Sequence, residues 1–177
     1  MPPTYRLSSF EQLTTAELYA VLALRAEVFV VEQACAYQDL DGLDQAAIHL
    51  TQYVGDALIG YTRLLAPGTD FEHACAIGRV VTAPTHRRRG YGRPLMRASI
   101  AECHRRWPGS DIDIHAQTYL LSFYRGFGFR PYGEEFLEDG LPHHFMRLAA
   151  PLSPYGKTKP DGSGPTAKLS SATKPGE

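Results

Sequence analysis

The sequence predicts an α/β fold in which helices pack on a mixed sheet, in one domain of about 150 residues. Three observations support this fold class. Short segments rich in β-branched and aromatic residues alternate with segments of helical periodicity. The 177 residues are 44% apolar, which is enough to bury a sizeable core. The composition changes abruptly near residue 150, which marks the end of the domain.

The first half of the chain is predicted to contain a strand, a helix and a hairpin. The three strands cover residues 5–10, 47–53 and 57–65. Thr14 and Glu17 form a capping-box pattern, which opens a helix over residues 15–28. Gly55-Asp56 separates the second strand from the third and predicts a tight turn between them.

The second half alternates strands and helices. Its strands are predicted over residues 75–82, 111–117, 129–132 and 143–148. An amphipathic helix follows the first of these strands and stops at Trp107-Pro108. A short helix over residues 118–127 is closed by Gly128, a residue suited to a left-handed cap. Asp139-Gly140 lies in a polar loop between the last two strands.

Residues 151–177 form a second region of different composition. All four lysines of the chain lie there, among Pro, Gly, Ser and Thr, so the segment has little apolar surface to bury. We therefore expect residues 1–150 to form the domain and residues 151–177 to form a flexible tail.

Charge favours a small anionic ligand over a nucleic acid. The chain carries 18 basic and 19 acidic side chains, a net charge of −1, whereas nucleic-acid-binding domains are usually basic. Seven of the 14 arginines nevertheless lie within residues 87–106. We expect this local positive charge to serve a small polyanion, and we expect no nucleic-acid partner.

Several other classes of protein are disfavoured. The longest apolar run covers residues 18–24, far short of the about 20 residues that span a bilayer. We expect no membrane segment, no secretory signal and a cytoplasmic location. Cys35, Cys75 and Cys103 lack C-x-x-C spacing, which disfavours a disulfide framework. His73-x-Cys75 has no further ligands at useful spacing, so we expect no metal site.

A glycine-bearing turn between the strand at 75–82 and the next helix is the most informative segment. Gly90 and Gly92 let the backbone approach a ligand, and a helix start offers unpaired N–H groups and a positive dipole end. Flanking guanidinium groups add bidentate donors, from Arg87, Arg88, Arg89 and Arg93. The turn matches neither a P-loop nor a dinucleotide fingerprint. It predicts a phosphate or pyrophosphate site, with a solvated basic turn as the alternative.

This turn resembles the acyl-CoA pyrophosphate loop of the GNAT N-acetyltransferases, in the pattern Arg-x-x-Gly-x-Gly after a valine-rich strand. The string FYRGFGF at residues 123–129 resembles a later motif of that superfamily. Four further segments resemble its ElaA-type branch, at residues 24–33, 37–41, 77–81 and 139–143. The resemblance covers residues 10–148 in the correct order. It implies a central mixed sheet with splayed parallel strands, here 75–82 and 111–117, flanked by helices.

The resemblance also implies an activity: transfer of an acetyl group from acetyl-CoA directly to a small-molecule or peptide amine, in a ternary complex. The implied cofactor contacts are Val80, Val81, Thr82, Arg87, Arg88, Arg89, Gly90, Tyr91, Gly92, Arg93 and Gln117. Gln117 stands where many members have an asparagine. Tyr124 would protonate the departing thiolate, and Glu32 or His143 would take the proton of the amine.

Each of these roles has an alternative. Tyr124 could be a core aromatic residue, Glu32 an ion-pair partner of Arg25, and His143 a residue at the edge of a strand. An acidic cluster could attract a cationic amine or form a solvated loop, and it comprises Asp39, Asp41 and Asp44. A non-catalytic acyl-CoA-binding regulatory module is the alternative function. The sequence leaves monomer and homodimer open.

Overall fold

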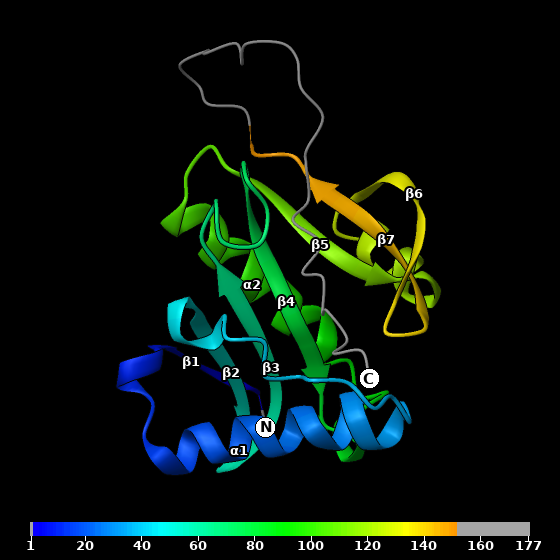
Figure 1. Ribbon diagram of the computed structural model, residues 1–177. Coiled ribbons are helices and arrows are strands. Elements are labelled where there is room, and N and C mark those ends of the chain that lie inside the picture. The colour runs from blue at the N-terminus through cyan, green and yellow to red at the C-terminus, as the bar shows by residue number, and fades with distance from the viewer. Residues whose placement is uncertain (1, 152–177) are drawn as a thin grey trace, which may run out of the picture.

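The computed structural model describes residues 2–151, which contain a single seven-stranded sheet in the order β1-β2-β3-β4-β5-β7-β6 (Figure 1). The strands are β1 (Thr4–Ser9), β2 (Ile48–Val54), β3 (Ala57–Leu65), β4 (Ala74–Thr82), β5 (Asp111–Gln117), β6 (Arg130–Glu138) and β7 (Leu141–Leu148). The β4–β5 pair is parallel and the other neighbours are antiparallel. The predicted mixed sheet is confirmed. The predicted tail lies outside the described residues from position 152 onward.

The parallel strands β4 and β5 are paired at one end only. Their register covers three residue pairs, Ala74 to Ala76 with Asp111 to Asp113, after which the strands diverge (Figure 1). A bulge in β4 accompanies this divergence, because two residues of β4, Arg79 and Val80, lie opposite the single residue Thr62 of β3. The predicted splayed strands are therefore present.

Helices cover both faces of the sheet. α1 (Thr15–Arg25) and its π-helical continuation η2 (Ala26–Glu32) pack on one face, and α2 (Gly92–Arg106) packs on the other. The third helix, α3 (Leu121–Arg125), follows β5. Short 3₁₀ turns complete the fold, at Phe10–Gln12, Asp44–Ala46, Pro84–His86 and Thr118–Leu120.

Sequence patterns predicted most helices and strands at their observed places, but some of the predicted boundaries were wrong. The capping box at Thr14 is confirmed, since its hydroxyl accepts from the Glu17 N–H at 3.2 Å. The helix expected over 15–28 is α-helical only to Arg25. The segment expected as one helix over 118–127 is a 3₁₀ turn followed by the short α3. β6 is longer than expected because it is an edge strand, whose polar exposed residues resemble a loop.

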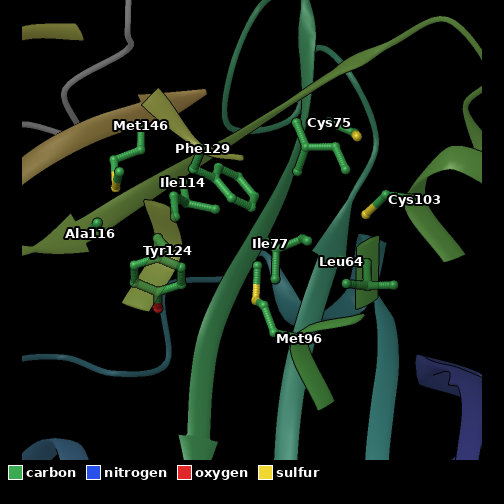
Figure 2. Close-up of a cluster of buried hydrophobic side chains, with 11 residues drawn as sticks. Leu64, Cys75, Ile77, Met96, Cys103, Ile114, Ala116, Tyr124, Phe129 and Met146 are labelled. Carbon is green, nitrogen blue, oxygen red and sulfur yellow. The ribbon is translucent and has the colours of Figure 1, made fainter. Parts of the chain in front are cut away.

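The main core lies between the sheet and α2. Its buried side chains come from β3, β4, β5, β7, α2 and α3 (Figure 2). Tyr124 and Phe129 belong to this cluster, so the FYRGFGF segment is packed against the diverging strands. A smaller cluster joins α1 to the opposite face of β3 and β4.

Two strand glycines differ sharply in the space around them. A Cβ at Gly60 would lie 2.7 Å from Gln52 Oε1 and 3.0 Å from Leu95 Cδ2, whereas a Cβ at Gly78 would meet nothing within 4 Å. We expect Gly60→Ala to destabilise the fold by about 1–3 kcal/mol, because the added methyl overpacks the contact between β3 and α2. Gly78→Ala is the matched control and should change stability little. Urea unfolding measures both, and equal effects would contradict the close contact.

Candidate functional site

The free edge of β4 faces the gap between the diverging strands. Beyond Ala76, this edge has no strand partner among residues 2–151. The Ala83 N–H donates to Ile59 O at 2.8 Å, so alternation along the ladder directs the main chain of Val81 toward β3 and that of Thr82 toward the gap. The Arg87 Nε accordingly reaches Thr82 O at 3.2 Å from outside the ladder. An unpaired strand edge of this kind can bind the amides of an extended ligand.

The glycine-bearing turn leads from β4 into the start of α2. Arg88 and Gly90 have positive φ values of 59° and 83°, so the turn depends on left-handed backbone at both positions. α2 begins at Gly92 after Tyr91, and the first N–H groups of this 15-residue helix therefore lie beside the turn. Arg87, Arg88 and Arg89 are exposed, so their positive charge is available at the same place.

Arg87 is held by an ion pair with Glu32. Its Nη1 lies 2.5 Å from Glu32 Oε1, which joins the end of η2 to the arginine-rich turn. This hydrogen bond lowers the pKa of Glu32, so its carboxylate is a weaker proton acceptor than an unpaired glutamate. The alternative partner considered for Glu32, Arg25, was wrong, because Arg25 is bound to aspartates elsewhere.

The FYRGFGF segment packs on the start of α2. The Arg93 guanidinium lies over the rings of Phe123 and Phe127, 5.8 and 5.7 Å from their centroids. A Cβ at Gly126 would lie only 3.3 Å from Arg93 Nη1, so glycine leaves room for this stacking. The two motifs that stood far apart in the sequence therefore form one structural unit.

Tyr124 lies at the centre of this unit with only 5% of its surface exposed. Its ring packs edge-on against Phe123 and Phe129, as the packing interpretation expected. Its hydroxyl points away from the core cluster (Figure 2), and no residue within 2–151 hydrogen-bonds to it. Burial raises the pKa of Tyr124, which keeps the phenol protonated at neutral pH. The geometry is compatible with a proton donor.

The segment after η2, which includes Gln33 and Cys35, crosses the gap from the β4 side to the β5 side. Gln117, at the end of β5, donates from Nε2 to Gln33 Oε1 at 3.3 Å. The Cys35 thiol lies 3.3 Å from the Asp139 carbonyl in the β6–β7 turn. This segment thereby contacts both the β5 end and the β6–β7 hairpin.

His143 lies beside a second histidine that the sequence analysis missed. Its Nδ1 lies 2.8 Å from Leu141 O, and its Nε2 lies 3.9 Å from Glu138 Oε2. The same carboxylate lies 3.1 Å from Nδ1 of His115 on β5. Burial lowers the pKa of His115, but the hydrogen bond to Glu138 and its negative charge outweigh this, and the pKa is raised. The alternation of β5 could have revealed His115, since its odd-numbered residues face away from the α2 core.

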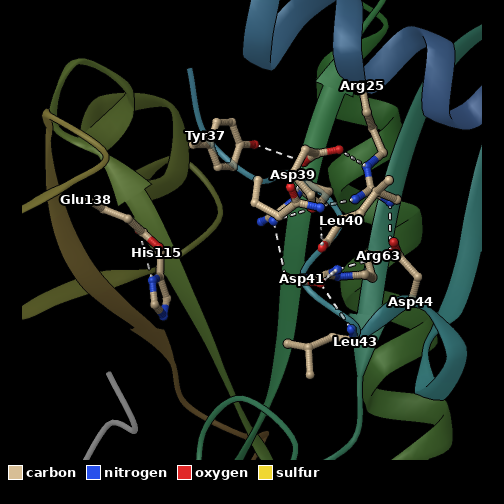
Figure 3. A network of polar contacts seen from close by, with 12 residues as sticks. Arg25, Tyr37, Asp39, Leu40, Asp41, Leu43, Asp44, Arg63, His115 and Glu138 are labelled. Carbon is tan, nitrogen blue, oxygen red and sulfur yellow. Dashed lines mark hydrogen bonds and ion pairs between the residues drawn. The ribbon is translucent and has the colours of Figure 1, made fainter. Parts of the chain in front are cut away.

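The acidic cluster is neither a solvated loop nor a free anionic site. Its three aspartates bind three arginines of α1, β3 and β4, at 2.6 to 3.1 Å (Figure 3). The pairs are Arg25 with Asp39 and Asp44, Arg63 with Asp41 and Asp44, and Arg79 with Asp39 and Asp41. Both expectations for the cluster were wrong, because buried guanidinium groups require these carboxylates as partners.

Three further observations concern metal ions, membranes and cysteines. Residues 2–151 contain no group of three or more His, Cys, Asp or Glu side chains that could hold a metal ion. Within the same range, every helix is too short or too polar to cross a membrane. The three cysteines are free thiols, with Cys75 and Cys103 buried.

Comparisons with known proteins agree with this geometry. The chain is 40% identical over 134 residues to protein ElaA of Escherichia coli, covering 75% of this chain and 87% of ElaA. The crystal structure of that protein superposes with a TM-score of 0.77 and 37% identity, covering 82% of this chain and 99% of that one.

Two other solved structures share the fold. An acyl-CoA N-acyltransferase from Pseudomonas aeruginosa has a TM-score of 0.79 and 39% identity, covering 84% of this chain and all of that one. A Bacillus subtilis acetyltransferase solved in complex with CoA shares the fold alone, with a TM-score of 0.60, 20% identity and coverage of 86% of this chain and 100% of that one. A sequence model of the acetyltransferase (GNAT) domain matches residues 12–150. The chain therefore belongs to the GNAT acetyltransferase family.

Proposed function

We propose that this protein is an N-acetyltransferase that moves the acetyl group of acetyl-CoA directly to an amine. The observation that carries the proposal is the juxtaposition of three features: the edge of β4 and the Tyr124 hydroxyl, neither of which has a partner within residues 2–151, and the arginine-rich turn before α2. Family membership supports acyl transfer, and the acetyl donor and amine acceptor are our inference.

Acetyl-CoA, the acetyl donor, would bind in the gap between the diverging strands β4 and β5. We assign its pyrophosphate to the N–H groups between Arg87 and Arg93, where the helix dipole and the exposed guanidiniums favour negative charge. We assign its pantetheine amides to the main chain of β4 between Val80 and Thr82, and a further contact to Gln117 at the end of β5. Since β4 and β5 do not pair with each other there, and no other strand of the described residues lies between them, the ligand replaces no strand contact of residues 2–151.

The chemistry needs one oxyanion site and one acid. A main-chain N–H on the free edge of β4 would stabilise the negative oxygen of the tetrahedral intermediate. Tyr124 would protonate the departing sulfur, which helps at neutral pH because a CoA thiol, like cysteine, has a pKa near about 8.5. The base must be a group other than a tightly paired carboxylate. The ion pair of Glu32 with Arg87 indicates that Glu32 connects η2 to the arginine-rich turn and does not act as the base.

Gly90 tests the pyrophosphate assignment. Gly90→Val places a β-branched residue at φ +83°, so the turn must change its backbone, and we expect acetyl-CoA affinity to fall at least about 10-fold. Gly109→Val is the matched control, because Gly109 has φ +80° and equally open surroundings at the other end of α2. Isothermal titration with acetyl-CoA measures both variants. If Gly90→Val binds acetyl-CoA with the affinity of the wild-type protein, the assignment of the pyrophosphate to this turn is wrong.

A thiol-release screen tests the activity itself. Wild-type protein is incubated with acetyl-CoA and one of four amines: spermidine, glucosamine, lysine, or a peptide with a free amino terminus. We expect one class to release free CoA at a rate that saturates with both substrates, as a ternary complex requires. A protein that binds acetyl-CoA and releases no thiol with any amine would be a regulatory binding module instead.

A further inference from the structure

A histidine–glutamate cluster, His115 with Glu138 and His143, lies on the face of the sheet opposite α2. The Glu138 carboxylate accepts a hydrogen bond from His115 Nδ1 at 3.1 Å, so the proton of the neutral imidazole is held on Nδ1. The other ring nitrogen, Nε2, then carries the lone pair. This is the arrangement by which a carboxylate prepares a histidine to accept a proton.

Aromatic rings fix the orientation of the His115 imidazole. Phe71 and Phe145 approach it edge-on, at centroid distances of 5.1 and 5.0 Å, and Phe136 does so at 6.0 Å. The side chain is nevertheless 29% exposed, so it is enclosed without being sealed from a ligand. An imidazole that is held in one orientation, partly shielded from water and still accessible to a ligand has the properties of a general base.

The cluster lies beside the gap between β4 and β5. His115 is two residues beyond Asp113, the last residue of β5 that pairs with β4. Figure 3 places His115 and Glu138 across from Tyr37 and the arginine–aspartate network. The positive charge of Arg79 in the β4 bulge lowers the pKa of both His115 and Glu138, as a smaller effect than burial and the hydrogen bond between them, so the bulge lies within range of the cluster.

We propose that His115, oriented by Glu138, is the base that deprotonates the acceptor amine. This inference rests on the proposed N-acetyltransferase function. It names a residue that neither the sequence analysis nor the comparisons assign.

The proton transfers balance in three steps. His115 Nε2 takes one proton from the ammonium group, and the neutral nitrogen attacks the thioester carbon. The carbon–sulfur bond breaks as Tyr124 protonates the sulfur. The second proton leaving the nitrogen restores Tyr124, and the imidazolium returns its proton to solvent. One proton is released for each amide formed.

The other two candidates fit this role less well. Glu32 is ion-paired with Arg87 at 2.5 Å, which lowers its pKa and engages one of its two carboxylate oxygens. His143 is buried, and its Nε2 lies 3.9 Å from the same Glu138 carboxylate, so this nitrogen faces Glu138 and not a substrate. We infer that His143 supports Glu138 and that His115 meets the substrate.

Charged groups from four directions set the titration of His115. Glu138 of β6 and Asp70 of the β3–β4 connection raise its pKa, and Arg79 of β4 lowers it, while His143 of β7 shares Glu138. Because the net effect is a rise, the rate should increase with pH along a limb centred above the ordinary histidine value of 6.5. Glu138→Gln should move that limb to lower pH and reduce its plateau.

The test compares His115→Gln with His144→Gln, using the fastest amine from the four-amine screen. His144 is a half-buried histidine of β7 that bonds Thr118, outside the proposed machinery. At pH 7 we expect His115→Gln to lower kcat/KM by about 10²-fold or more, and His144→Gln to change it less than about twofold. At pH 9.5 the loss should shrink, because more of the amine is already neutral.

The outcomes separate this inference from the proposed function. If wild-type protein transfers acetyl groups and His115→Gln does so at the same rate, the base assignment is overturned and the function stands. An equal loss at both pH values also overturns it, since it indicates a structural role. If wild-type protein transfers to none of the four amines, both fail. If titration shows that His115→Gln has lost acetyl-CoA affinity, the pH dependence of the rate in Glu138→Gln becomes the test. The inference is overturned if the rate of Glu138→Gln rises over the same pH range as the rate of the wild-type protein.

Discussion

Tyr124→Phe is expected to lower kcat by about 10²-fold while the affinity for acetyl-CoA stays within about twofold. The ring of Tyr124 packs in the core, and phenylalanine keeps that packing. The hydroxyl has no hydrogen-bond partner among the described residues, so its removal leaves no buried group unpaired. The substitution therefore removes the proposed acid and little else.

Three measurements on this variant make the result specific. Thiol release gives kcat with the chosen amine, titration gives the acetyl-CoA affinity, and thermal unfolding gives stability. Tyr19→Phe is the control, since Tyr19 is 76% exposed on α1. An unchanged kcat in Tyr124→Phe would leave Tyr124 with a packing role only.

Asp44→Ala is expected to destabilise the fold by about 3–5 kcal/mol, the typical cost of removing one partner from a buried ion pair. Asp44 is 4% exposed and lies 2.9 Å from Arg25 Nη1 and 3.0 Å from Arg63 Nη1. Both arginines are almost fully buried, at 0% and 2% exposure. Alanine would leave two guanidinium groups in the interior with one carboxylate fewer between them.

Urea unfolding measures this loss, with Asp56→Ala as the control. Asp56 is an exposed aspartate in the β2–β3 turn, and its removal should change stability by less than about 0.5 kcal/mol. A loss below about 1 kcal/mol for Asp44→Ala would mean that water or the remaining aspartates solvate both arginines.

Signals carried by neighbouring residues could be predicted from the sequence. The Thr14–Glu17 cap, the turn at Gly55-Asp56 and the glycine-bearing entry to α2 each depend on a few adjacent side chains. The β4–β5 splay followed from the family resemblance, because no local pattern shows that two strands diverge.

Long-range partners could not be predicted in the same way. Asp39, Asp41 and Asp44 have the spacing of a solvated loop, and only the fold brings Arg25, Arg63 and Arg79 to them. His115 and Glu138 are 23 positions apart and meet because β5 and β6 both flank β7. The edge position of β6 likewise made a strand resemble a loop.

The three-pair junction of β4 and β5 also determines how the sheet holds together. Within residues 2–151, four strands lie on one side of this junction and three on the other, and only the three-pair register joins the two sets as a ladder. We therefore expect amide hydrogens on the inner edges of β4 and β5 to exchange faster than those of an ordinary ladder. A substrate that binds between β4 and β5 would take the place of the missing strand. Binding would therefore stabilise the sheet against separation of its two sets of strands.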